Sequence, residues 1–139
     1  MSGPSVADIP TTWDDVANYI RTQYAVEKEW PGRGFIFLEK GAVGQHRLFL
    51  ARNNPGWGGV DHVTLEASLG PAEQVNLPAA AQCASKLMGG LVCADGTATL
   101  RESRCLSTLS LDHLNMTIGY LVGALEGYLL VTSQNSTGY

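Results

Sequence analysis

The stretch "VDHVTLEASLG", Val60 to Gly70, decides the fold class. Its apolar and polar residues alternate, which is typical of a β-strand with one buried face and one wet face. Because a sheet with one wet face is antiparallel rather than parallel, the stretch predicts an antiparallel sheet. The apolar side is formed by Val63, Leu65, Ala67 and Leu69, and the polar side by His62, Thr64, Glu66 and Ser68.

Two apolar runs before this stretch are its expected neighbours in the sheet. They are "RGFIFLEKG" (33–41) and "QHRLFLAR" (45–52). Both are rich in strand-forming residues, and the short Gly-containing link between them predicts a hairpin. Together with the strand that begins at Val60, they predict a three-stranded meander.

A helix is expected before the meander. Thr11 or Thr12 can cap a helix that starts at Trp13, because a threonine hydroxyl accepts a backbone N–H of the first turn. Apolar residues then recur at helical spacing, which indicates one buried stripe. We expect this helix to end before Pro31.

A second hairpin and two more helices follow the meander. Asp95-Gly96 lies between "LVCA" (91–94) and "TATLRES" (97–103), and this dipeptide is a strong signal for a two-residue hairpin turn. An Ala-rich helix is predicted over 79–88. Ser110 can cap a last helix with a long apolar stripe.

The predicted order is therefore α-β-β-β-α-β-β-α. It corresponds to an α+β fold with a single antiparallel sheet of about five strands and helices packed on one face. With 139 residues, one domain is expected, over 12–131, between flexible tails at 1–11 and 132–139.

Composition narrows the class of function. The net charge is −4 and nine basic residues are spread along the chain, which argues against a nucleic-acid partner. The most apolar run, Ile118 to Val131, is interrupted by polar residues and glycines, so no membrane partner is expected. The N-terminal ten residues lack a secretory pattern. We expect a cytoplasmic protein whose three cysteines are free thiols.

The sequence contains no recognisable catalytic or metal-binding motif. The three histidines and three cysteines lack metal-ligand spacing, so no metal and no other cofactor is expected. No nucleophile motif is present. Asp61 and Glu66, five residues apart on one strand, point to opposite faces and do not form a catalytic pair. The chain is therefore expected not to be an enzyme, with no catalytic residues.

The C-terminal third carries a resemblance to a known superfamily. A short helix (79–88), a tight hairpin at Asp95-Gly96 and the phrase "LSLD" (109–112) lead into a long final helix. In layout and hydrophobic spacing this resembles the type III secretion chaperone-like superfamily, which includes the YbjN-like proteins. The resemblance covers roughly Trp13 to Leu130. It implies a non-catalytic homodimer that binds a protein or peptide partner, as a chaperone or regulatory adaptor.

If this resemblance holds, two surfaces are expected. A partner would bind the wet sheet face, the loop around Trp57 and the polar strand after Asp95, where aromatic and charged side chains are available. The homodimer would form through the Ala-rich helix and the strand after it. The partner residues are Trp57, His62, Thr64, Glu66, Arg101 and Arg104, and the dimer residues are Ala80, Ala84, Leu87 and Leu91.

A competing hypothesis is a small-molecule sensor or an enzyme with a site between the sheet and the final helix. It would require a deep pocket with converging titratable groups, which the sequence does not indicate. Arg101, Glu102 and Arg104 also have a plainer interpretation, as the solvated end of a strand.

Overall fold

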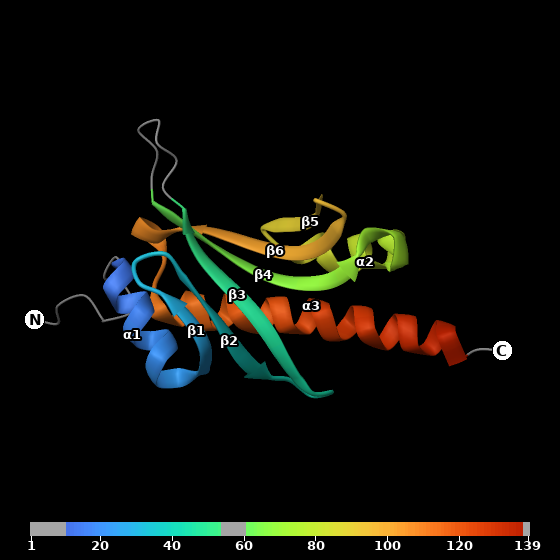
Figure 1. Cartoon of the computed structure of the whole chain (residues 1–139), viewed down its shortest axis with the longest axis horizontal. Coiled ribbons are helices and arrows are strands. Elements are labelled where there is room, and N and C mark those ends of the chain that lie inside the picture. Colours follow the sequence, from blue (N-terminus) through green and yellow to red (C-terminus); the bar gives the residue numbers. More distant parts are fainter. Residues whose placement is uncertain (1–10, 54–60, 138–139) are drawn as a thin grey trace, which may run out of the picture.

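Six strands form one antiparallel sheet, and the helices cover one of its faces (Figure 1). The computed structural model describes residues 11–53 and 61–137. The strand order is β1-β2-β3-β4-β6-β5. The predicted α+β class, with one antiparallel sheet and helices on one face, is confirmed. In chain order the elements are α1 (Trp13–Gln23), β1 (Ala25–Trp30), β2 (Gly34–Lys40), β3 (Gln45–Asn53), β4 (His62–Pro71), η2 (Ala72–Gln74), α2 (Leu77–Cys83), η3 (Ala84–Lys86), β5 (Gly89–Ala94), β6 (Thr97–Cys105), η4 (Leu106–Thr108) and α3 (Leu111–Thr137), where η marks a short 3-10 helix.

The sixth strand, β1, occupies a segment expected to belong to the end of the first helix. The helix ends at Gln23, and β1 pairs with β2 through a turn at Trp30-Pro31-Gly32-Arg33. Arg33 N donates to Trp30 O (2.9 Å), and Gly32 has φ of +74°. Proline followed by a glycine with positive φ is a type II turn. This turn signal, rather than helical spacing, determines the structure of 25–30.

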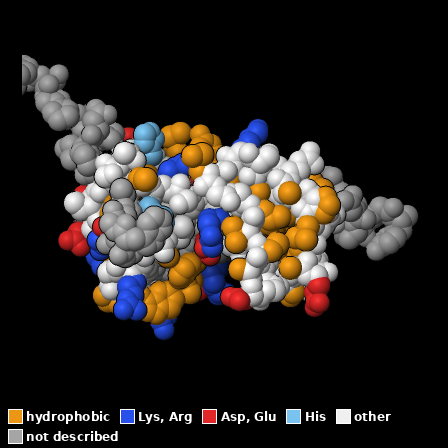
Figure 2. Space-filling view, turned by 90° about the horizontal axis from the view of Figure 1, so that it is seen from above, with side chains coloured by type: hydrophobic (Ala, Val, Ile, Leu, Met, Phe, Trp, Pro, Cys, Tyr) orange, Lys and Arg blue, Asp and Glu red, His pale blue; other side chains and the backbone are white. Residues whose placement is uncertain are grey.

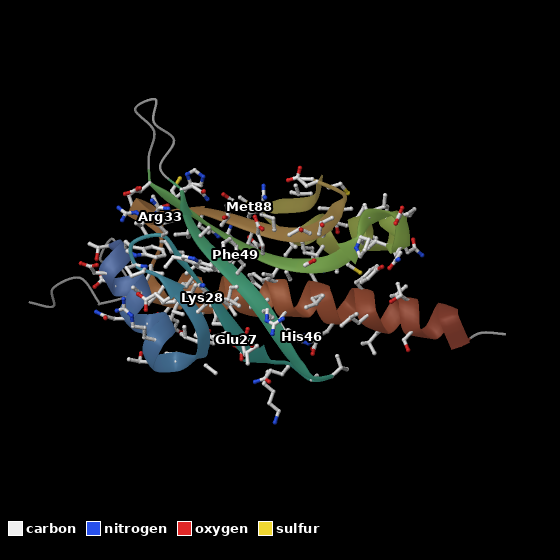
Figure 3. The ribbon with its side chains drawn as sticks, in the orientation of Figure 1. Glu27, Lys28, Arg33, His46, Phe49 and Met88 are labelled. Atoms are coloured by element: carbon white, nitrogen blue, oxygen red, sulfur yellow. The ribbon has the colours of Figure 1, made fainter. Side chains whose placement is uncertain are left out.

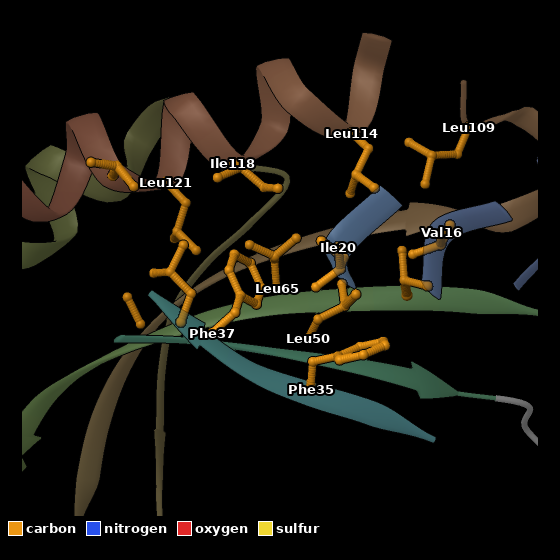
Figure 4. Packing of buried hydrophobic residues seen from close by; sticks show 14 of the residues in the cluster. Val16, Ile20, Phe35, Phe37, Leu50, Leu65, Leu109, Leu114, Ile118 and Leu121 are labelled. Atoms are coloured by element: carbon orange, nitrogen blue, oxygen red, sulfur yellow. The ribbon is translucent and has the colours of Figure 1, made fainter. Parts of the chain in front are cut away.

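The core lies between the sheet and the two longer helices. The Thr12 hydroxyl accepts from Asp15 N (3.2 Å) and so caps α1, as one of the two predicted capping residues. Val16 and Ile20 of α1 and Ile118 of α3 are fully buried. Figure 4 shows these side chains pointing at Phe35, Phe37, Leu50 and Leu65 of the sheet.

The predicted Asp95-Gly96 hairpin is present and joins β5 to β6. Both turn residues have positive φ, +52° and +76°, as a type I′ turn requires. The Ala-rich segment is shorter than expected as an α-helix, because α2 ends at Cys83 and η3 continues it.

The last helix is longer than expected. It continues to Thr137, through most of the segment predicted as a C-terminal tail. By length and composition alone, Leu111–Ser133 would be able to cross a membrane, and 39% of its most apolar window is buried against the rest of the chain. A long core helix meets the same criterion, so this observation does not assign a membrane role.

Glu126 of α3 holds the β2–β3 hairpin loop against the helix. Its carboxylate accepts from Ala42 N (3.0 Å) and Val43 N (2.9 Å), and His46 Nε2 lies 2.8 Å from Oε2. The contact to His46, followed by the Val43 amide, lowers the pKa of Glu126. A Cβ at Gly41 would overlap the same carboxylate. The Glu126 side chain therefore holds the loop of the β2–β3 hairpin against α3.

We expect Glu126→Ala to lower the melting temperature by several degrees, because two backbone donors and His46 lose their shared acceptor. The lowered pKa means that this stabilisation is present at neutral pH and is lost as the pH falls through the folded-state pKa. The measurement is thermal unfolding of both proteins at pH 7 and in acid. Glu73→Gln, at an exposed position, is the control. Equal melting temperatures at pH 7 would contradict the assignment.

Candidate functional site

The sheet face opposite the helices carries a trough of small side chains that crosses the strands. Its floor follows the strand register from Gly34 of β2 to Ala51 of β3, Thr64 of β4 and Ser103 of β6. Trp30, which pairs with Gly34, stands at one end. With adjacent strands about 4.8 Å apart, these five positions span roughly 19 Å. We refer to Gly34, Ala51, Thr64 and Ser103 as the trough floor.

The strand beyond β6 extends this row by one position. Ser103 N donates to Met88 O (3.1 Å), just before β5, and the Met88 side chain is 62% exposed. The trough therefore has a large apolar residue at each end. Figure 3 labels Met88 at one side of the sheet, with Phe49 of β3 near its middle.

One wall of the trough consists of an aromatic ring followed by an ion pair. Phe49, Glu66 and Arg101 occupy neighbouring strands in register. Phe49 is 37% exposed, and its ring meets that of Trp30 edge-on, with centroids 5.9 Å apart. Arg101 lies 2.7 Å from Glu66 Oε1. The other wall is formed by Asn53 and His62, and Asn53 Nδ2 donates to Thr64 Oγ1 (3.1 Å).

Two hollows lie along the trough and share Phe49 and Ala51 as lining residues. One, of about 500 Å³, extends toward Arg101 and His62. The other, of about 370 Å³, extends toward Trp30 and Gly34. Phe49 therefore borders both, and each is large enough to receive a side chain of a bound molecule.

Backbone sterics explain part of the floor. A Cβ at Gly34 would overlap the carbonyl oxygen of Leu50 on the adjacent strand, so only glycine fits there. Ala51 is its cross-strand partner. A glycine and an alanine side by side leave the hollow between Trp30 and Phe49 open.

Some of the charged groups around the trough are paired within the chain. Arg101 pairs with Glu66 in the trough wall. Arg52 instead lies 2.8 Å from Asp61 and places its guanidinium over the Trp13 ring of α1. The Arg52 guanidinium lowers the pKa of Asp61 through their hydrogen bond.

Arg33, which lines the hollow at Trp30, forms no ion pair with the described residues, and Lys28 lies over the Trp30 ring, 5.2 Å from its centroid. The trough thus offers hydroxyl groups and aromatic rings, with the positive charges of Arg33 and Lys28 at its Trp30 end. Among residues 11–53 and 61–137, no group of three His, Cys, Asp or Glu side chains is placed to hold a metal ion.

The structure brings four of the six predicted partner residues together: His62, Thr64, Glu66 and Arg101 line one hollow. Trp57 lies outside the described residues. Arg104 points to the opposite face, where it lies with His113 and Tyr120 of α3. It does so because side chains alternate along β6, so residues three positions apart face opposite sides. Arg104 is therefore not part of the trough.

The polar strand after Asp95, which was expected to contact a partner, does not lie at the edge of the sheet. β6 lies between β4 and β5, and the edges are β1 and β5. β1 carries Glu27, Lys28 and Glu29, whereas β5 has no charged residue. Charged side chains protect an edge against pairing with other chains, and β5 lacks them. Figure 2, a view of the molecule from above, shows hydrophobic side chains gathered over the half that carries α2 and β5.

The predicted dimer residues are mostly enclosed by their own chain. Ala80 and Ala84 are 0% and 3% exposed, so neither side chain is available to a second copy. Leu87 and Leu91 are half-buried and pack against the core. The side chains of Ala80 and Ala84 pack inside the chain, which corrects the expectation that these two alanines meet a partner helix.

Glu102, which sequence reasoning left open as a solvated strand end, is buried at 1% exposure. Its Oε2 accepts from Met88 N (3.2 Å) and lies 3.5 Å from Arg104. Its Oε1 has no hydrogen-bond partner. Burial raises the pKa of this carboxyl, and the Met88 amide and Arg104 oppose that rise.

Sequence reasoning missed Phe49, Trp30, Ser103 and Met88 as members of the trough. The signal for Phe49 was available, because it is an aromatic residue at a wet-face position between Leu48 and Leu50. The other three come together through the register of five strands, which the sequence does not reveal.

The space between the sheet and α3, where the competing hypothesis placed a site, is filled by core side chains such as Leu65, Leu100 and Leu121. A hollow of about 660 Å³ lies instead between α2 and α3. Comparison of the chain with family models, with curated proteins and with solved structures finds no match in any of the three.

Proposed function

We propose that this chain is a non-catalytic binding domain whose trough holds an extended segment of a protein partner. The observation that carries the proposal is Phe49, an exposed aromatic ring at the junction of two hollows on an open sheet face. Exposed aromatic side chains in such positions supply a large share of binding energy. The resemblance to secretion chaperone-like and YbjN-like proteins supports the same class of function.

The chemistry of the trough favours an extended segment with apolar side chains. From Trp30 to Met88 the trough extends roughly 24 Å, which matches about seven residues of extended chain. Arg101 is already paired with Glu66, so a charged ligand would have to compete for it. Arg33 at the Trp30 end, by contrast, has no ion pair with the described residues. The Ser103 hydroxyl is of a type that donates to or accepts from a peptide backbone, and Thr64 Oγ1 already accepts from Asn53 Nδ2.

We expect Phe49→Ala to weaken peptide binding by about 1–2 kcal/mol, because truncation removes the wall shared by both hollows. The ligands would be peptides selected from a random library displayed on phage against the wild-type protein. Their affinities for both proteins would be measured by fluorescence anisotropy, with circular dichroism as the check on folding.

Val43→Ala is the matched control, because Val43 is 50% exposed on the β2–β3 loop, outside the trough. The same peptides should bind this variant as tightly as the wild type. Amide chemical shifts should change at Ala51, Thr64 and Arg101 when a peptide is added. Shifts confined to α3, or equal affinities for the wild type and Phe49→Ala, would refute the trough as the site.

A further inference from the structure

The side of α3 that faces away from the sheet is apolar along four turns. Met116, Tyr120 and Leu130 are 49%, 54% and 50% exposed there. Met116, Gly123 and Leu130 repeat every seven residues and so lie along one line, opposite the buried Leu121. The outer face of a helix on a soluble domain is normally polar. We refer to Met116, Gly119, Tyr120, Gly123, Gly127 and Leu130 as the outer stripe.

Two glycines of the outer stripe have no steric role within the chain. A Cβ at Gly119 or Gly123 would meet nothing within 4 Å. Glycine in a helix interior is about 1 kcal/mol less favourable than alanine. The isolated chain would therefore be more stable with alanine at both positions. Glycine is useful where another backbone approaches closely.

An open groove borders the stripe. The hollow of about 660 Å³ between α2 and α3 has Tyr120, Gly123 and Gly127 on one wall, and Cys83 and Leu87 on the other. Most of this lining is apolar, and Gln82, Ser85 and Lys86 are its polar residues. The groove and the outer stripe thus form one continuous apolar surface, distinct from the trough on the opposite side of the sheet.

We propose that a second copy of this chain covers this surface, with the two α3 helices packed antiparallel and crossing at Gly123. The stripe is self-complementary about that residue. Met116 lies seven residues before it and Leu130 seven after, so each meets the other on the partner copy. Gly119 and Gly127 lie four residues before and after, so they oppose each other close to the crossing. A two-fold axis through Gly123 requires this kind of symmetry.

The required area explains why the groove belongs to the interface. A contact confined to α3 would cover a strip roughly 21 Å long and 10 Å wide. A stable interface buries about 800 Å² on each partner. The groove walls supplied by α2 and η3 must therefore take part, and their apolar lining suits the bulky side chains of the partner's stripe.

The charge pattern favours a second copy over a lipid surface. From Leu114 to Leu125 the helix has no charged residue, and its last turn has no basic one. Helices that lie on membranes carry Lys and Arg along their polar flanks. Because the stripe carries no charge, two copies of it can pack together without electrostatic repulsion, which suits homodimer formation.

The test is sedimentation velocity over low to high micromolar concentrations with wild type, Gly123→Arg and Val43→Arg. Wild type and Val43→Arg should form a concentration-dependent dimer, and Gly123→Arg should stay monomeric. Because a side chain at 123 has room and arginine favours helix more than glycine, Gly123→Arg should melt no lower than the wild-type monomer. That separates a lost interface from a damaged fold.

A second variant locates the crossing. With Cys83, Cys93 and Cys105 replaced by serine, Gly123→Cys should oxidise to a disulfide-linked dimer, since the two positions would face each other across the axis. A wild-type monomer at all concentrations, or a dimer that persists in Gly123→Arg, would overturn the proposal. The proposal would also be overturned if wild type floated with phosphatidylglycerol vesicles and Gly123→Arg did not. That result would assign the surface to lipid. None of these outcomes bears on peptide binding in the trough.

Discussion

Ala84→Arg should unfold the protein, with a loss of several kcal/mol of stability, because it places a charged side chain at a fully enclosed position. Ala84 is 3% exposed and belongs to the core cluster at the junction of α2 and η3. If its side chain faced a second copy instead, the same substitution would yield a folded monomer. Near-UV circular dichroism and urea unfolding distinguish the two outcomes.

Ala81→Arg is the matched control for this substitution. Ala81 lies on α2, three residues before Ala84, and is exposed. This variant should unfold at the wild-type urea concentration, since an exposed arginine on a helix carries no desolvation penalty. An Ala84→Arg protein with wild-type stability and a reduced mass in solution would restore the α2 dimer and refute the intrachain role.

Glu102→Gln should stabilise the protein at pH 8 by about 1–3 kcal/mol, because it removes a buried charge. Oε1 of Glu102 has no partner, and burial raises the pKa of the carboxyl. Glutamine has nearly the same shape and keeps a carbonyl oxygen for Met88 N. Arg104, whose side chain is 28% exposed, can turn to solvent once the carboxylate is gone.

The pH dependence gives this prediction its sign. A carboxyl with a raised folded-state pKa binds its proton more tightly in the folded protein, so stability falls as the pH rises from about 4.3, the unperturbed value, through the raised pKa. The advantage of Glu102→Gln should therefore be absent in acid, grow across that window and then level off. The measurement is urea unfolding in steps from pH 4 to pH 8.

Glu73→Gln serves as the control for the lost charge, because Glu73 is exposed and should show no such window. If Glu102→Gln were instead less stable than wild type at pH 8 and equal to it in acid, the ion pair with Arg104 would outweigh the desolvation of the carboxylate. That result would make the buried charge a stabilising feature.

The class of fold was predictable from local patterns. The alternation of Val63, Leu65 and Ala67 with polar neighbours identified an antiparallel sheet with one wet face, and the structure places those three in the core. Thr12 and the Asp95-Gly96 turn were also recognised, because caps and tight turns depend on a few neighbouring residues. The strand at 25–30 was missed because the expected helix was extended up to Pro31, over the segment that pairs with β2.

The site was predictable in part, for a related reason. His62, Thr64 and Glu66 were identified as neighbours because they alternate along one strand. Arg101 joined them by way of the register between β4 and β6, which also turned Arg104 to the other face. No pattern within one strand reports that register.

By itself, the sequence determined the alternation of each strand, the helix cap, the turns and the absence of a metal-ligand spacing, since each of these rests on residues close together in the chain. Tertiary structure decided which strands lie at the edges, that Ala80, Ala84 and Glu102 are enclosed, and that Trp30, Phe49 and Ser103 share one trough. The physical reason is that burial and cross-strand contact depend on the packing of segments distant in sequence. Two residues with the same local pattern, such as Ala81 and Ala84, therefore have opposite surroundings.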